Sequence, residues 1–106
     1  MEDTKVLSFN QLCESGFPYR DYKWLDEAGH FIGIVEEKSW GKSQNLIVYC
    51  RLIENADITR KVCFSVYQQR DYYMGFKDVP KGTMLNLFFL KNSKNRGYLV
   101  RWSDAA

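Results

Sequence analysis

The sequence has little of the residues on which most catalytic and metal-binding chemistry depends. It contains one histidine and three cysteines, Cys13, Cys50 and Cys63. Because the number of cysteines is odd and their spacings match no zinc pattern, we expect free and mostly buried thiols. We expect no metal and no other cofactor.

Long apolar runs and a targeting signal are also missing. No hydrophobic stretch approaches the roughly 18 residues that a membrane-spanning helix requires. The N-terminus MEDTKVLSFNQL has acids where a secretory signal begins with basic residues. We therefore expect a cytoplasmic protein with no membrane partner. The 106 residues, 45% hydrophobic and 26% charged, suit one globular domain that folds on its own.

Aromatic side chains are plentiful, at 16% of the chain. Such a content indicates a β-rich core, a surface on which rings stack, or both. The net charge of +2 is too small to establish a polyanionic partner, so the distribution of the cations has to decide.

The letters GKS at positions 41–43 match the end of a nucleotide-binding P-loop. That loop needs a glycine five residues before Gly41, where this chain has Glu36, and it needs a helix afterwards. The segment that follows, NLIVYCRLI, is β-branched and aromatic instead. We therefore expect SWGKSQ to be a polar loop between two strands.

The chain divides into a short N-terminal helix with its linker, residues 1–18, and a domain of residues 19–106. Ser8 and Gln11 have the spacing of a helix capping box. In the domain, alternating apolar and polar residues predict five strands, with a bulge or bend at Gly33 in the first. The strands are expected at 30–40, 45–53, 58–67, 83–92 and 97–102, with a helical connector over 68–76 between the third and fourth.

The second and third strands predict a hairpin with a defined register. Leu46, Val48, Cys50 and Leu52 face one side and oppose Val66, Phe64, Val62 and Arg60. Cys50 and Cys63 then point to opposite faces, which excludes a disulfide between them. On the other face Arg51 and Lys61 are neighbours, and this like-charge pair costs stability unless an anion lies between them. Three acids are alternatives to a bound anion: Glu54, Asp57 and Asp71.

This order of elements resembles the OB-fold, a five-stranded Greek-key barrel, over residues 28–102. The features that carry the resemblance are FIGIVEEKSW, the long central hairpin, and PKGTMLNLFFLKNSKNRGYLVRW, which is similar to the closing hairpin of single-stranded DNA-binding proteins. The fold class is therefore expected to be all-β with small α content. The resemblance implies a binding surface on the second and third strands, rimmed by the loops SWGKSQN and KNSKNRG.

Binding of a single strand without sequence preference needs aromatic faces for the bases and cations for the phosphates. The aromatic candidates are Trp40, Tyr49 and Tyr67. The cationic candidates are Lys42, Arg51, Lys61, Lys91, Lys94, Arg96 and Arg101. Each has a structural alternative: Trp40 can cover the barrel rim, a one-residue change of register would bury the two tyrosines, and the loop cations can serve only solubility.

Two functions remain open from the sequence. The first is a nonenzymatic single-stranded DNA-binding protein, with RNA as a second candidate ligand, of the small kind that phages and mobile elements encode for replication or recombination. The second is an OB-type protein-interaction module, a subunit or inhibitor of a nucleic-acid-processing assembly. Phe9 and Leu12 on the N-terminal helix are then candidates for docking or self-association, with packing across the barrel's open end as the alternative. An enzyme is not expected, because no acid, base, nucleophile or metal set converges.

Overall fold

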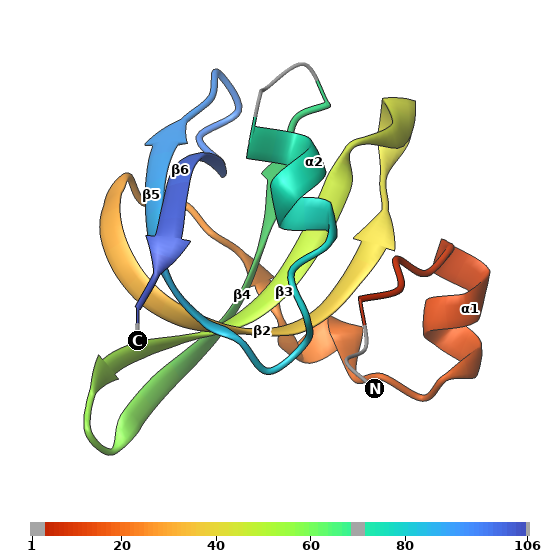
Figure 1. Cartoon of the computed structure of the whole chain (residues 1–106), viewed down its shortest axis with the longest axis horizontal. Coiled ribbons are helices and arrows are strands. Elements are labelled where there is room, and N and C mark those ends of the chain that lie inside the picture. The colour runs from red at the N-terminus through yellow and green to blue at the C-terminus, as the bar shows by residue number, and fades with distance from the viewer. Residues whose placement is uncertain (1–3, 69–71, 106) are drawn as a thin grey trace.

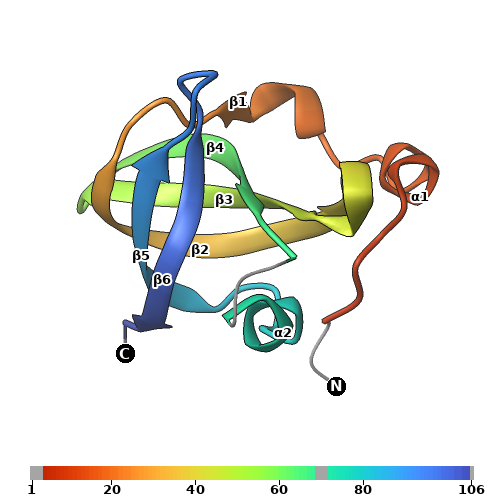
Figure 2. The same cartoon turned by 90° about the horizontal axis from the view of Figure 1, so that it is seen from above.

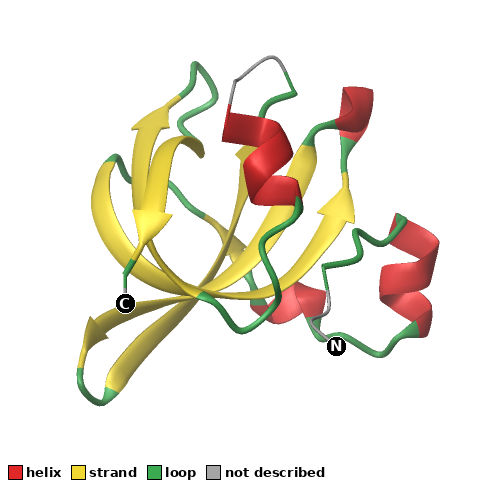
Figure 3. Ribbon diagram, in the orientation of Figure 1, coloured by secondary structure: helices red, strands yellow, loops and turns green. Residues whose placement is uncertain are grey.

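The computed structural model describes residues 4–68 and 72–105. Strands dominate it, and the helices are short (Figure 3). In chain order the elements are α1 (Phe9–Glu14), η1 (Tyr19–Asp21), β1 (Lys23–Trp24), β2 (Gly29–Trp40), η2 (Lys42–Gln44), β3 (Leu46–Asn55), β4 (Ile58–Val66), α2 (Tyr72–Lys77), β5 (Met84–Lys91) and β6 (Gly97–Asp104).

Strands β2 to β6 close into the five-stranded, OB-fold-like barrel that the sequence predicted (Figure 1). β2 pairs antiparallel with β3 on one side and with β5 on the other. The barrel closes where β4 meets β6 in parallel, with Ser65 opposite Tyr98. The sequence did not reveal β1, which pairs in parallel with β4, because two residues are too few to show an alternation.

The predicted hairpin register is confirmed. Leu46 lies opposite Val66, Val48 opposite Phe64, Cys50 opposite Val62 and Leu52 opposite Arg60. Cys50 lies in the barrel core, whereas Cys63 lies in a second cluster outside it, and both are free thiols. The alternation of large apolar residues therefore determined which face of each strand is buried.

The bulge in β2 does not lie at Gly33, where the sequence predicted a bulge or bend. It falls between Val35 and Glu37. Gly33 has a packing role instead, because a Cβ there would lie 3.0 Å from side-chain carbons of both Leu52 and Leu87. Before the bulge β2 pairs with β3 and β5, and after it with β3, while Leu7 forms a parallel bridge to Ser39. The bend lets one strand belong to both sides of the barrel (Figure 2).

The connector between β4 and β5 is fixed to the barrel by a buried cation. Phe76 of α2 packs edge-on against Phe64 and Trp102, at ring-centroid distances of 6.3 and 5.5 Å. The side chain of Lys38 on β2 is fully buried, and its Nζ donates to the carbonyl oxygens of Lys77 and Val79. These contacts hold the end of α2 against β2.

Candidate functional site

The N-terminal segment covers the face of the β3–β4 hairpin that was expected, from the sequence, to bind a ligand. Leu12, Tyr22, Tyr49 and Cys63 form a buried cluster outside the barrel core. Tyr49 is 5% exposed, and its ring packs edge-on against Phe17 and Tyr22 at centroid distances of 5.4 and 5.7 Å. The prediction that Tyr49 stacks on a base is therefore wrong for this arrangement, because rings from the N-terminal segment lie against it.

The predicted capping box of α1 is confirmed. Gln11 N donates to Ser8 Oγ at 3.1 Å, and Ser8 N donates to Gln11 Oε1 at 2.9 Å. The helix does not pack across an open end of the barrel, because Leu12 joins the cluster on the outer face of β3 and β4. Fully buried, Leu12 has no surface for another protein, whereas Phe9 is 53% exposed.

Arg51 and Lys61 are direct neighbours, as the sequence predicted, but an acid of the chain already pairs with Arg51. Arg51 Nε lies 3.0 Å from Glu36 Oε1, in an ion pair without hydrogen-bond geometry. Lys61 Nζ lies 5.7 Å from the centroid of the Tyr22 ring. The acids expected from the sequence were Glu54, Asp57 and Asp71, of which Asp71 lies outside the described residues. The pair therefore no longer indicates a bound polyanion.

A groove of about 500 Å³ lies between the β2–β3 loop and the β5–β6 loop. Four predicted residues border it: Lys42, Tyr67, Lys94 and Arg96. The residues of its lining that the sequence did not single out are Trp24, Gly41, Asn45, Ile47, Ser65, Asn92 and Ser93. Nothing in the sequence around Trp24 indicated a place in the groove, apart from the apolar residues near it, Tyr22 and Leu25.

The β2–β3 loop forms one wall of the groove as a tight turn. Gly41 N donates to the carbonyl oxygen of Asn45 at 2.8 Å, and Asn45 N donates to that of Lys42 at 3.1 Å. A Cβ at Gly41 would lie 2.9 Å from Ile47 Cδ1, so a larger residue there would displace the end of that side chain. The segment SWGKSQ is thus a turn between antiparallel strands, as predicted, and the exposed Lys42 stands at its start.

The β5–β6 loop forms the opposite wall and is organised by one amide. Asn92 Oδ1 accepts hydrogen bonds from Lys94 N at 2.9 Å and from Arg96 N at 3.1 Å. With its oxygen occupied, the amide turns Nδ2 toward Tyr67 and donates to the phenolic oxygen at 3.1 Å. Tyr67 accepts in this bond, and its own O–H has no acceptor among residues 4–68 and 72–105, so that O–H can donate to a ligand.

Aromatic faces meet these loops from two strands. Trp24 is 37% exposed, and the guanidinium carbon of Arg96 lies 4.8 Å from its ring centroid. The half-buried Tyr67 lies beside Tyr98, with ring centroids 5.1 Å apart. The groove therefore presents an indole and a phenol ring between cationic loops.

The cations that border the groove differ in their ion pairing from the arginines of the β3–β4 hairpin. Arg60 is paired with both Glu27 and Glu54, at 2.8 and 3.1 Å. Within residues 4–68 and 72–105, Lys42, Lys94 and Arg96 form no ion pair. An unpaired cation beside an aromatic ring is free to bind an external anion.

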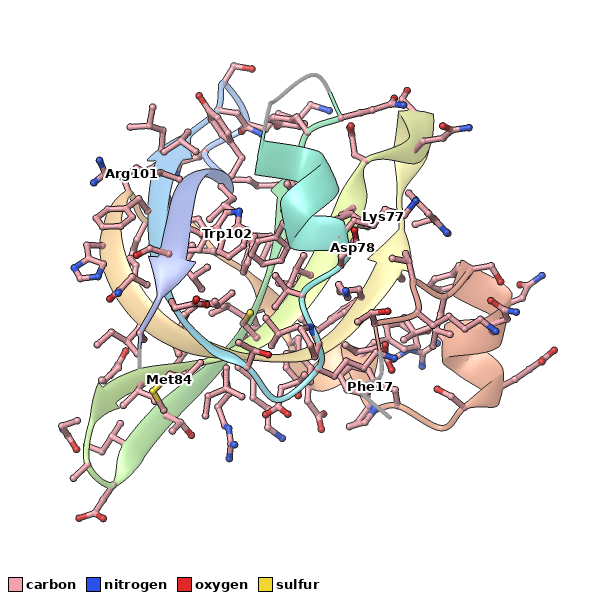
Figure 4. The ribbon with its side chains drawn as sticks, viewed as in Figure 1. Phe17, Lys77, Asp78, Met84, Arg101 and Trp102 are labelled. Atoms are coloured by element: carbon pink, nitrogen blue, oxygen red, sulfur yellow. The ribbon has the colours of Figure 1, made fainter. Side chains whose placement is uncertain are left out.

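Four further predicted residues, besides Tyr49 and Arg51, do not border the groove. Trp40 is half-buried against the barrel core, and Lys77 Nζ lies 5.2 Å from its ring centroid, so Trp40 covers the rim. Lys61 is exposed beside Tyr22, and Lys91 lies at the end of β5. Arg101 lies on the outer side of β6, whereas the next residue, Trp102, points toward α2 (Figure 4).

The two buried thiols, Cys50 and Cys63, are held in their protonated form. Burial raises the pKa of Cys63 to about 12, and burial raises the pKa of Cys50 well above its ordinary value. Neither sulfur is therefore a thiolate nucleophile at neutral pH. Among the residues that the structure describes, no group of three His, Cys, Asp or Glu side chains could hold a metal ion. No described helix is long and apolar enough to span a membrane.

Comparison of the chain with protein-family models, with curated proteins and with solved structures finds no match.

Proposed function

We propose that this protein is a nonenzymatic, cytoplasmic single-stranded DNA-binding protein that acts in replication or recombination, of the kind that a phage or mobile element encodes. The observation that carries the proposal is the groove, where the cations Lys42, Lys94 and Arg96, unpaired among the described residues, surround the partly exposed rings of Trp24 and Tyr67. The strand would lie between the two loops, with RNA as the alternative ligand of the same chemistry.

The composition of the groove favours a single strand over a duplex. In a duplex the faces of the bases are covered by their neighbours, so Trp24 and Tyr67 could not reach them. In a single strand each base offers a face, and stacking on a protein ring contributes about 1–3 kcal/mol. Cations on both walls can then contact successive phosphates, and the Tyr67 O–H can donate to an oxygen of the strand.

The experiment is a titration of labelled oligothymidine with the protein, followed by fluorescence anisotropy at low and high salt. The double variant Lys94→Ala/Arg96→Ala should lose most of the affinity. A matched control, Arg51→Ala/Lys61→Ala, removes the same charge from cations outside the groove and should bind as the wild type does. Absence of binding at low salt, or an equal loss in both variants, would refute the proposal.

One observation favours the second candidate, a protein-interaction module. Phe9 is 53% exposed on α1, and its ring stands edge-on to that of Tyr19 at 5.4 Å. Arg20 donates to the Tyr19 hydroxyl at 3.2 Å, so an aromatic and cationic patch lies on the N-terminal segment. If this patch binds a partner or a second copy, Phe9→Ser should abolish that association in light scattering and leave oligothymidine binding unchanged.

A further inference from the structure

A second set of aromatic and cationic side chains lies on the outer face of β2, β5 and β6, away from the groove. His30, Phe88 and Arg101 are cross-strand neighbours in one row. The rings of His30 and Phe88 are stacked, with centroids 4.5 Å apart and planes 10° apart. The guanidinium carbon of Arg101 lies 4.2 Å from the Phe88 centroid. Three flat groups therefore follow one another across three strands.

The row is held in place from its histidine end. His30 Nε2 lies 3.0 Å from Asn86 Oδ1, while Asn86 Nδ2 donates to the carbonyl oxygen of Asp104 at 3.2 Å. Because the amide nitrogen is used in that second bond, the amide oxygen faces the imidazole and accepts from it. The fixed imidazole supports Phe88, and Phe88 in turn supports the guanidinium.

Arg101 differs from the other arginine that lies over a phenylalanine. Arg60 stands 5.7 Å from the Phe31 centroid, but Glu27 and Glu54 both neutralise it. Arg101 forms no ion pair or hydrogen bond with any residue of 4–68 and 72–105, and along β6 the first acid after it is Asp104. A planar cation held by a ring and left without an anion suits a base face or a phosphate.

The surroundings of Arg101 are hollowed, and strand β6 leads to them from the cationic loop. A depression of about 480 Å³ lies beside it, lined also by His30, Phe88, Leu90 and Val100. Leu90 is 52% exposed. From Gly97, where the β5–β6 loop ends, to Arg101 the strand advances about 13 Å, at roughly 3.3 Å per residue. A chain that passes Lys94 and Arg96 and crosses Lys91 can therefore reach Arg101.

We propose that the outer face of β5 and β6 is a second contact for the same nucleic-acid strand, in which the guanidinium plane of Arg101 stacks on a base. This inference rests on the proposed function. The strand leaves the groove across the β5–β6 loop and continues over Leu90 to Arg101, so that the protein holds it on both sides of that loop. The occupant is a polyanion with flat bases because the face offers an unpaired planar cation and cations lead to it from the groove.

The test is a series of oligothymidines of about 6 to about 16 nucleotides, within the range of lengths that one such barrel covers. Wild-type affinity should rise as the strand becomes long enough to reach Arg101. Arg101→Ala should bind the shortest strand as the wild type does and bind the longest about tenfold more weakly. Arg101→Lys, which keeps the charge and removes the plane, should lose most of the same gain.

Arg20→Ala is the matched control, since Arg20 is another exposed arginine over a ring, 5.6 Å from the Tyr19 centroid. This variant should show the same rise of affinity with strand length as the wild type. An unchanged gain in Arg101→Ala, or full retention in Arg101→Lys, overturns the inference while binding of the short strand still supports the groove. A change in self-association with unchanged DNA binding would make the face a protein contact and also overturn it. If no strand binds at all, the proposed function fails first.

Discussion

The guanidinium carbon of Arg96 lies 4.8 Å from the centroid of the Trp24 ring, so the β5–β6 loop rests on β1. The backbone fixes the same approach, because Gly97 N donates to the carbonyl oxygen of Leu25 at 2.6 Å. A Cβ at Gly97 would lie 2.9 Å from Leu25 Cδ2. The cation and the indole are therefore brought together by chain packing, and they form one corner of the groove before any ligand binds.

The exposed tryptophan of the groove should report on binding. We expect oligothymidine to quench Trp24 fluorescence and Trp24→Ala to weaken binding by about 1–3 kcal/mol, the contribution of one stacked base. Trp40→Phe, a change in the core rim outside the groove, should keep both the quenching and the affinity. Quenching that persists in Trp24→Ala and disappears in Trp40→Phe would place the base elsewhere.

The salt dependence of binding should count the phosphate contacts. For a single strand each contact contributes about 0.7 to the slope of log K against log salt. Lys94→Ala should therefore reduce the slope by about that amount. Arg51→Ala is the control, since Arg51 already has Glu36 as its ion partner. Equal slopes for wild type and Lys94→Ala would mean that this loop cation contacts no phosphate.

Tyr49 and Tyr67 should separate stability from binding. Because Tyr49 is buried against the N-terminal segment, Tyr49→Ala should lower the free energy of unfolding by about 3–5 kcal/mol, as for other large aromatic truncations. The affinity of the folded variant should stay near that of the wild type. Tyr67→Ala should lower the affinity for oligothymidine strongly and the free energy of unfolding less than Tyr49→Ala does. Urea denaturation and oligonucleotide titration measure the two quantities, and a binding defect confined to Tyr49→Ala would contradict the assignment.

Lys38 should matter to the fold rather than to the ligand. In Lys38→Met the carbonyl oxygens of Lys77 and Val79 lose a buried donor, at a cost of about 1–3 kcal/mol each. Lys42→Met, on the exposed turn a few residues later, should change stability by less than about 0.5 kcal/mol. Urea midpoints compare the two variants, and equal midpoints would show that the buried ammonium does not hold the connector.

Alkaline pH should loosen the cluster beneath the N-terminal segment. Burial raises the pKa of Cys63 from 9.0 to about 12, and burial raises that of Tyr22 from 10.0 to about 12. Both shifts favour the protonated form in the folded state, so their stabilisation is complete below pH 9 and declines as the pH rises toward 12. The double variant Cys63→Ala/Tyr22→Phe should show a smaller decline in urea midpoint over this range. An equal decline would assign the alkaline loss to other groups.

The barrel was predictable from the sequence because its strands alternate large apolar and polar residues over long stretches. The pairing of Leu46 with Val66 follows from that period, since a shift by one residue would bury the opposite face. The loop residues Lys42, Lys94 and Arg96 were also identifiable, because the resemblance to the OB-fold implies that these two loops border the binding surface.

The cover over Tyr49 was not predictable from local pattern. Which face of a hairpin is exposed depends on a segment distant in the sequence. The local sequence around Phe17 and Tyr22 does not indicate that these two rings pack on β3. Likewise, the pairing of Arg51 with Glu36 requires the register of β2 against β3, which a bulge shifts. The neutralised cation and the buried ring are both consequences of tertiary packing.

The most direct test of the central claim is an NMR titration that follows backbone amide shifts as oligothymidine is added at low salt. We expect the largest shifts on the two walls and the floor of the groove, at Trp24, Lys42, Ser65, Tyr67 and residues 92–96, and little change at Tyr49 and α1. Shifts centred on Tyr49 and α1, or no shifts at low salt, would contradict the central claim.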